Sequence, residues 1–106
     1  MNPMGPTHAD DHEAFLAVLT EVHGILARLK PDKRPQITPT TSVIFDLDMD
    51  SLGLVDLSAA LEAAFDLDEF PIQEWCDEEE AIAGSYSVDS LARECLRRIR
   101  VAKEHR

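Results

Sequence analysis

The chain contains few cysteines, few aromatic residues and few glycines. Cys76 and Cys95 are the only cysteines, and two cysteines without a motif spacing define neither a disulfide framework nor a zinc site. Because aromatic residues make up only 6% of the chain, the core must be mainly aliphatic. No apolar run has the length of a membrane span and no signal-peptide pattern occurs, so we expect no membrane insertion and a cytoplasmic protein.

Basic residues are absent from the middle of the chain. Between Pro35 and Ala92 there is no Lys or Arg, against fourteen Asp or Glu, and the net charge of the 106 residues is −11. An acidic region of this kind repels nucleic acid and anionic lipid, and it speeds encounters with partners that carry basic patches. The alternative is that these acids only keep a small domain in solution. The length predicts one domain, which we expect to be a monomer without nucleic-acid partners.

The usual arrangements of catalytic residues are also missing. Ser51 has no Gly-x-Ser-x-Gly elbow around it, and there is no glycine-rich phosphate cradle. The four histidines all lie outside the central segment, at His8, His12, His23 and His105. We therefore expect no catalytic residues and no enzymatic activity.

A calcium-binding loop is another possible site to consider. Asp46, Asp48 and Asp50 alternate as in an EF-hand loop, which leaves weak binding of a divalent cation open. However, the positions that shape and close such a loop carry the wrong residues, namely Ser51, Gly53 and Leu57. We therefore predict no metal site.

Apolar residues at helical spacing predict an all-α fold of four helices, with a short third helix and a long loop between the first two. The expected helices span residues 10–30 (capped by Asp10 or Asp11), 51–65 and 72–83, and a final helix follows the cap Ser87. A flexible tail over 1–9, a domain over 10–100 and a basic tail over 101–106 complete the organisation. The residues expected to face the core are Phe15, Leu19, Val22, Leu26, Leu29, Leu54, Leu57, Leu61, Phe65, Trp75, Val88, Leu91, Cys95, Leu96 and Ile99, with Val43, Ile44, Phe45 and Leu47 anchoring the loop.

Ser51 is the most informative residue. Asp50-Ser51-Leu52 stands immediately before a long apolar helical pattern, so the Ser51 hydroxyl is expected at a helix N-terminus. Backbone N–H groups there lack partners inside the helix and the helix dipole favours negative charge, which suits a phosphate-linked group. The alternative is a plain helix cap without modification.

Residues 45–65 resemble the acyl carrier protein family, whose mark is an Asp-Ser-Leu at the start of the second of four helices. The resemblance implies a bundle of acyl-carrier type in which Ser51 carries 4′-phosphopantetheine and Asp50 and Leu52 complete the motif. The cofactor's thiol would hold acyl groups as thioesters in fatty-acid, polyketide or specialised lipid biosynthesis.

The resemblance also implies partners. Asp56 and Glu62 fall where the family keeps acids for basic partners, and Leu52, Val55 and Ala59 fall on its partner-contacting face. The expected partners are a phosphopantetheinyl transferase and the acyl-loading and chain-modifying enzymes with basic docking patches. Periodicity alone leaves open whether the apolar members of this face are exposed or part of the core.

The chain departs from the family pattern at several positions. Asp48 stands where the family usually has Gly, Gly53 where an acid is frequent, and Ala63 where a second Glu often follows. Gly53 is expected to allow close approach of a partner or of the arm. The stretch 66–87 is long and contains Trp75. With these differences, a dedicated carrier for polyketide, specialised lipid or aminoacyl chemistry fits as well as the housekeeping fatty-acid carrier or better.

A second Asp-Ser-Leu, Asp89-Ser90-Leu91, occurs near the C-terminus. Ser90 follows a better cap at Ser87 and is expected inside the first turn of the last helix, so it serves as a control for Ser51. Three alternatives stay open. The first is a peptidyl or aminoacyl carrier, including the D-alanyl type, because the layout of residues 70–75 is similar to that of some such carriers. The others are an unmodified acidic helical adaptor and a calcium-responsive module.

Overall fold

The computed structural model describes residues 4–82 and 84–104, with the side chains described from Asp11 onwards. In this part of the chain the elements are α1 (Met4–Leu29), the 3-10 helix η1 (Pro31–Gln36), α2 (Ser51–Phe65), α3 (Ile72–Ile82) and α4 (Val88–Glu104). No strand occurs among these residues, and the one β-bridge pairs Ser42 with Ser87. The all-α fold with a long connection between the first two α-helices is therefore confirmed.

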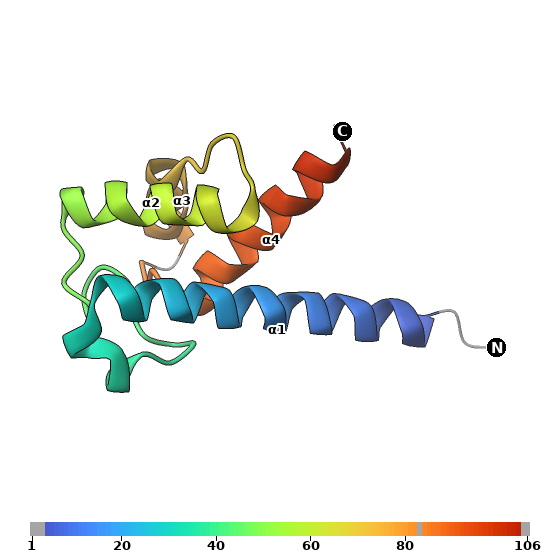
Figure 1. The fold of residues 1–106 in the computed structure, drawn as a ribbon, viewed down its shortest axis with the longest axis horizontal. Coiled ribbons are helices and arrows are strands. Elements are labelled where there is room, and N and C mark those ends of the chain that lie inside the picture. The colour runs from blue at the N-terminus through green and yellow to red at the C-terminus, as the bar shows by residue number, and fades with distance from the viewer. Residues whose placement is uncertain (1–3, 83, 105–106) are drawn as a thin grey trace.

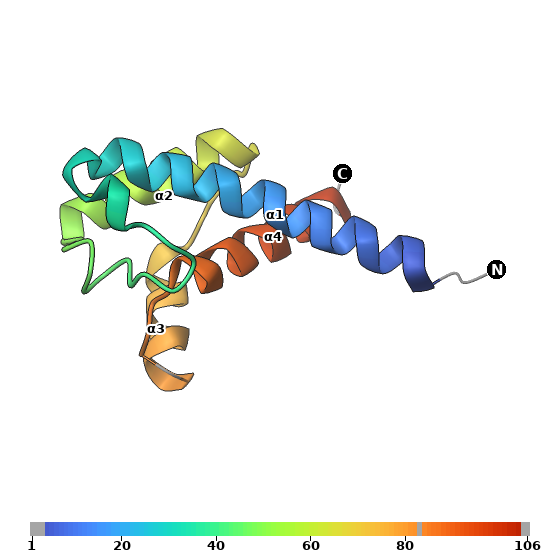
Figure 2. The ribbon, with the colours of Figure 1, turned by 90° about the horizontal axis from the view of Figure 1, so that it is seen from below.

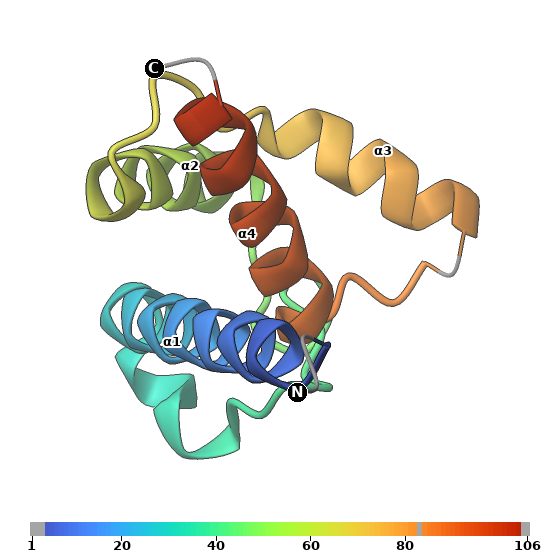
Figure 3. The same ribbon diagram turned by 90° about the vertical axis from the view of Figure 1, so that its right-hand side faces the viewer.

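Helix α1 packs against both α2 and α4, and these three helices form the body of the molecule (Figure 1). Figures 2 and 3 show that α3 extends away from this body, with its beginning close to α2 and its end far from it. The end of α1, η1 and the beginning of α2 lie together at one end of the molecule (Figures 1 and 2).

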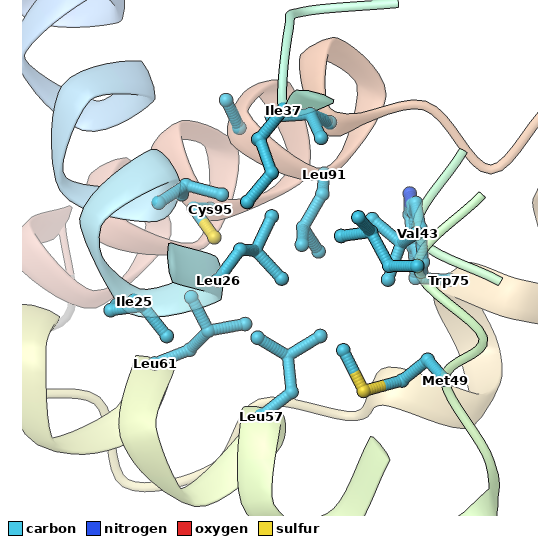
Figure 4. Packing of buried hydrophobic residues seen from close by; sticks show 14 of the residues in the cluster. Ile25, Leu26, Ile37, Val43, Met49, Leu57, Leu61, Trp75, Leu91 and Cys95 are labelled. Atoms are coloured by element: carbon cyan, nitrogen blue, oxygen red, sulfur yellow. The ribbon is translucent and has the colours of Figure 1, made fainter. Parts of the chain in front are cut away.

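The core lies between α1, α2 and α4 and includes side chains from the long loop (Figure 4). Leu26 of α1, Leu57 and Leu61 of α2 and Leu91 of α4 are fully buried there. Every residue expected to face the core from these helices is buried or packed against the buried cluster, as is Trp75. The helical periodicity therefore identified these core residues correctly, but it missed Val18 and Ile25 of α1, which are also buried.

The loop between α1 and α2 enters the interior, with Ile37, Val43, Leu47 and Met49 buried. Its backbone groups are paired with the beginning of α4. The Val88 N–H donates to the Thr41 carbonyl (2.9 Å), the Asp89 N–H to the Pro39 carbonyl (2.8 Å), and the Val43 N–H to the Tyr86 carbonyl (2.8 Å). A loop can be buried here because α4 supplies partners for its polar groups.

Several boundaries differ from those expected. α1 begins at Met4, so the expected start at Asp10 or Asp11 is wrong, and it includes part of the expected N-terminal tail. α4 continues to Glu104 and therefore includes part of the segment 101–106 that was expected to be a basic tail. Residues 1–3 and 105–106, which belong to the two expected tails and include His105, lie outside the described residues. Ala83, where the third helix was expected to end, lies outside them as well.

The loop anchor Phe45 is a further correction. Its side chain is 66% exposed, and its ring meets the ring of Tyr86 edge-on at 5.6 Å between centroids. The ring centroid of Tyr86 in turn lies 6.2 Å from that of Trp75. Phe45 is therefore a surface residue of an aromatic cluster instead of a core anchor.

Both cysteines are buried and unpaired, Cys76 on α3 and Cys95 on α4. Burial raises the pKa of the Cys95 thiol to about 12, and it also raises the pKa of Cys76, with Asp77 and Glu79 adding to the effect. Within the described residues, no helix combines the length and the apolar character needed to cross a membrane.

Arg98 of α4 bonds to Glu94 of the same helix and to Glu74 of α3, and so links the two helices. Arg98 donates from Nε to Glu94 (2.8 Å) and from Nη2 to Glu74 of α3 (3.2 Å), and Arg97 donates to Glu94 at 2.6 Å. Burial alone would raise the pKa of Glu94, but the hydrogen bonds and charges of Arg97 and Arg98 outweigh it and lower the pKa below its usual 4.5.

We predict that Glu94→Gln lowers the free energy of unfolding at pH 7 by about 1 kcal/mol, because charge-assisted hydrogen bonds are lost. A carboxyl whose folded pKa is depressed contributes stability above its unfolded pKa and loses it as the pH falls through the folded value. The difference from wild type, measured by urea unfolding, should therefore shrink below about pH 4.5. Glu13→Gln, on an exposed part of α1, is the control; an equal loss there would contradict the prediction.

Candidate functional site

Helix α2 begins at Ser51, as expected, and Asp50 is its N-cap. Asp50 has an extended backbone (φ −93°, ψ −176°), and its Oδ1 accepts a hydrogen bond of 2.7 Å from the Gly53 N–H. Its carbonyl accepts the first helical hydrogen bond, from the Leu54 N–H at 2.9 Å. The Asp50 carboxylate therefore fixes where the helix starts and leaves Ser51 as its first residue.

Ser51 is exposed at this N-terminus. By the geometry of an α-helix, the N–H groups of Ser51 and Leu52 have no carbonyl partner inside the helix, whereas the Gly53 N–H is taken by Asp50. Two backbone donors and the positive end of the helix dipole thus lie next to the hydroxyl. This arrangement fits a phosphate ester on Ser51, since the phosphate oxygens would find donors without displacing the cap.

Gly53 has a role within the chain itself. A Cβ at this position would lie 2.6 Å from Met49 Sδ and 3.2 Å from Asp50 Oδ1. Met49 is buried, so its thioether occupies the space that the missing side chain leaves. The expectation that Gly53 leaves room for a partner or for the arm is therefore wrong: that room is filled by Met49.

The three alternating acids before Ser51 have separate partners. Asp46 accepts the Ser42 N–H (2.8 Å), Asp48 pairs with Lys33 (3.7 Å), and Asp50 caps α2. Among the described residues, no three side chains of His, Cys, Asp or Glu are placed to share a metal ion. Each of the three carboxylates therefore has a structural contact of its own within the described residues.

The face of α2 that follows Ser51 is open to solvent. Leu52 is 76% exposed and Val55 is 63% exposed, and Asp56 and Ala59 are exposed as well. The question that periodicity left open is thereby answered, because these residues are not part of the core. An apolar pair with an acid beside it on one exposed helix face has the character of a contact surface.

Glu62, the second acid assigned to this face, is half-buried and already bonded. Its Oε2 accepts the Phe70 N–H at 2.9 Å, while the Ser58 hydroxyl donates to the Phe70 carbonyl at 2.7 Å. α2 thus holds both polar backbone groups of Phe70, whose side chain is buried. Sequence reasoning missed this role of Ser58; its only signal is the four-residue spacing from Glu62, which puts both on one side of the helix.

Ser90 has none of the features of Ser51. It is half-buried, and its hydroxyl accepts the indole N–H of Trp75 at 3.1 Å. Its own N–H donates to the cap Ser87 (3.1 Å), as expected. The two N–H groups before it, from Val88 and Asp89, donate to loop carbonyls. The N-terminus of α4 is therefore closed, and its serine has a structural bond.

Comparison with known proteins gives one match. The model of a family described as "Phosphopantetheine attachment site" matches residues 17–73, which is more than half of the chain and includes Ser51 but not Ser90. No curated protein and no solved structure matches the chain.

We predict that Asp50→Ala lowers the free energy of unfolding by about 1 kcal/mol, the usual effect of removing an N-cap. Asp50→Asn should cost much less, because its side-chain oxygen can still accept the Gly53 N–H. Urea unfolding at pH 7 measures both. Asp56→Ala, on the exposed side of the same helix, is the matched control, and the role of Asp50 as the cap is refuted if the two alanine variants are equally stable.

Proposed function

The chain belongs to the phosphopantetheine-attachment family, whose domain is the site of covalent 4′-phosphopantetheine attachment, and on this basis we propose that it is an acyl carrier protein modified on Ser51. One observation carries the choice of residue. Of the two Asp-Ser-Leu serines, Ser51 is exposed at an open helix N-terminus inside the matched region, whereas Ser90 bonds to Trp75 at a closed one.

The residues around Ser51 have simple tasks in this function. The bound group supplies a terminal thiol that holds the cargo as a thioester. Ser51 presents its hydroxyl to the transferase without help from a base, and the N–H groups of Ser51 and Leu52 would be available as donors to the phosphate. Asp50 keeps the helix start in place. Carriers of this family are generally not catalytic themselves.

We propose that partner enzymes dock on the exposed face of α2. Leu52, Val55 and Ala59 supply apolar contact, and Asp56 supplies a charge for basic patches on the partner. Glu62 contributes to this face less directly, since one of its oxygens already holds the Phe70 backbone. A phosphopantetheinyl transferase and acyl-loading or chain-modifying enzymes are the proposed partners.

For the cargo we propose an acyl group of fatty-acid, polyketide or specialised lipid biosynthesis. The large exposed side chains at and just before the start of α2 (Phe45, Leu52 and Val55) are apolar, which suits a cargo with a hydrocarbon part better than a charged aminoacyl group. Loading by an acyl ligase, compared with loading by an aminoacyl ligase, tests this choice once the arm is attached.

We predict that incubation with coenzyme A, Mg²⁺ and a broad-specificity phosphopantetheinyl transferase raises the mass of the protein by one phosphopantetheinyl group. Intact-mass spectrometry measures the gain. Ser51→Ala should abolish it, because the attachment oxygen is removed, and Ser90→Ala should retain it.

Circular dichroism shows whether each variant remains folded. Modification of Ser51→Ala would assign the arm to another residue. No gain in the folded wild-type protein with several transferases would favour the unmodified adaptor.

We further predict that Asp56→Lys raises the KM of the transferase for the carrier by about three- to tenfold at low salt, with a smaller effect at high salt, because a rim charge acts on encounter with a basic partner. Helicity should not change, since Asp56 is exposed. Asp68→Lys makes the same charge change at an exposed position outside α2. Equal effects of the two variants would show that only net charge matters and would refute docking through Asp56.

A further inference from the structure

Asp48 stands three residues before Ser51 in a conformation that favours glycine. Its φ is +51°, in the left-handed region, where residues with a Cβ are disfavoured and Asp and Asn are tolerated best. This turn brings Leu47 and Met49, on either side of Asp48, into the core. The Met49 N–H then donates to the Ile44 carbonyl at 3.3 Å, and the next residue is the cap of α2.

Two lysines that follow the end of α1 contact Asp48. Lys30 Nζ donates to the Asp48 carbonyl oxygen at 3.2 Å, and Lys33 Nζ lies 3.7 Å from Asp48 Oδ2. Both lysines are half-buried, whereas the Asp48 side chain is 78% exposed. Since residues 35–92 contain no Lys or Arg, the cations for this part of the chain come from outside that segment.

We propose that Lys30 and Lys33, acting through Asp48, are positioning residues for the modification of Ser51. This inference rests on the proposed function. The contacts, which we call the Asp48 clamp (Lys30, Lys33 and Asp48), hold the strained turn from which residues 49–51 continue, and so keep the attachment serine in the geometry that the transferase binds. Figure 1 shows the end of α1, η1 and the start of α2 at the same end of the molecule, as the clamp requires.

The expected kinetic signature follows from a population argument. Without the clamp, a smaller fraction of molecules holds residues 49–51 in the competent geometry, and the apparent affinity of the transferase falls by that fraction. Once the transferase has bound, the chemistry is unchanged. Loss of the clamp should therefore raise KM and leave kcat unaltered. Global stability should change little, because exposed ion pairs contribute little to it.

The sign of the effect separates the clamp from simple electrostatics. Removing a positive charge from an acidic carrier should, by long-range attraction alone, improve binding to a basic partner and lower KM. If Lys33 acts through Asp48, Lys33→Met raises KM instead. Arg34→Met is the matched control, because Arg34 is the next residue of η1 and is exposed.

The experiment is a double-mutant cycle on the full chain, with Lys33→Met, Asp48→Asn and the double variant. Asn keeps the tolerance for positive φ and loses only the charge. We expect KM to rise by about two- to fivefold in each single variant, the range that one partly exposed ion pair gives, with kcat within about twofold. The double variant should be no worse than either single variant, because both remove the same contact. Lys30→Met should raise KM in the same way, and Arg34→Met should not.

Amide hydrogen exchange provides a second readout that does not involve the transferase. The Met49 amide should exchange faster in Lys33→Met than in Arg34→Met, because it follows directly after the strained turn. Additive effects in the cycle, or equal behaviour of Lys33→Met and Arg34→Met in both KM and exchange, would overturn the clamp while the modification of wild type stands. Failure of wild type to be modified would overturn the proposed function and the clamp with it.

Discussion

The structure depends on the mutual pairing of the buried loop and the beginning of α4. A loop that places Ile37, Val43 and Leu47 in the core also buries backbone polar groups, and an unpaired buried group costs about 1–3 kcal/mol. The first N–H groups of α4 face the same difficulty at a helix end. The N–H groups of Val88 and Asp89 at the start of α4 donate to the Thr41 and Pro39 carbonyls of the loop. The loop thus gains donors for its carbonyls, and the helix end gains acceptors for its N–H groups. With the loop fixed in this way, its continuation delivers Asp50 and Ser51 to a defined place.

The features that were predicted from the sequence depend on local signals. The start of α2, the cap Ser87 and the buried stripes of the helices all follow from spacing and capping chemistry within a few residues. What could not be predicted depends on contacts between distant segments. The bond from Phe70 to Glu62, the Lys30 contact with Asp48 and the exposure of Phe45 are decided by tertiary packing, which no short pattern records.

The acidic character of the central segment has several physical causes. Asp46 and Asp50 bond to backbone N–H groups, and Glu62 holds the Phe70 backbone. These acids are needed to close turns and helix ends in a region that has no lysine or arginine. A charge count alone would assign all of them to partner recognition, whereas the geometry gives these three acids a role in folding and leaves Asp56 exposed on α2.

The burial of the two cysteines has a consequence for a protein that carries thioesters. A thioester migrates readily to a nearby thiolate, and a carrier with a reactive cysteine of its own would lose cargo to it. Cys95 is fully enclosed and, with a pKa of about 12, is essentially all thiol at neutral pH, and Cys76 is buried with a raised pKa as well. In the proposed carrier, neither thiol would compete for the thioester-bound group. The thiol of an arm on Ser51 would then be the one that electrophilic reagents reach first, and its labelling would distinguish loaded from unloaded carrier.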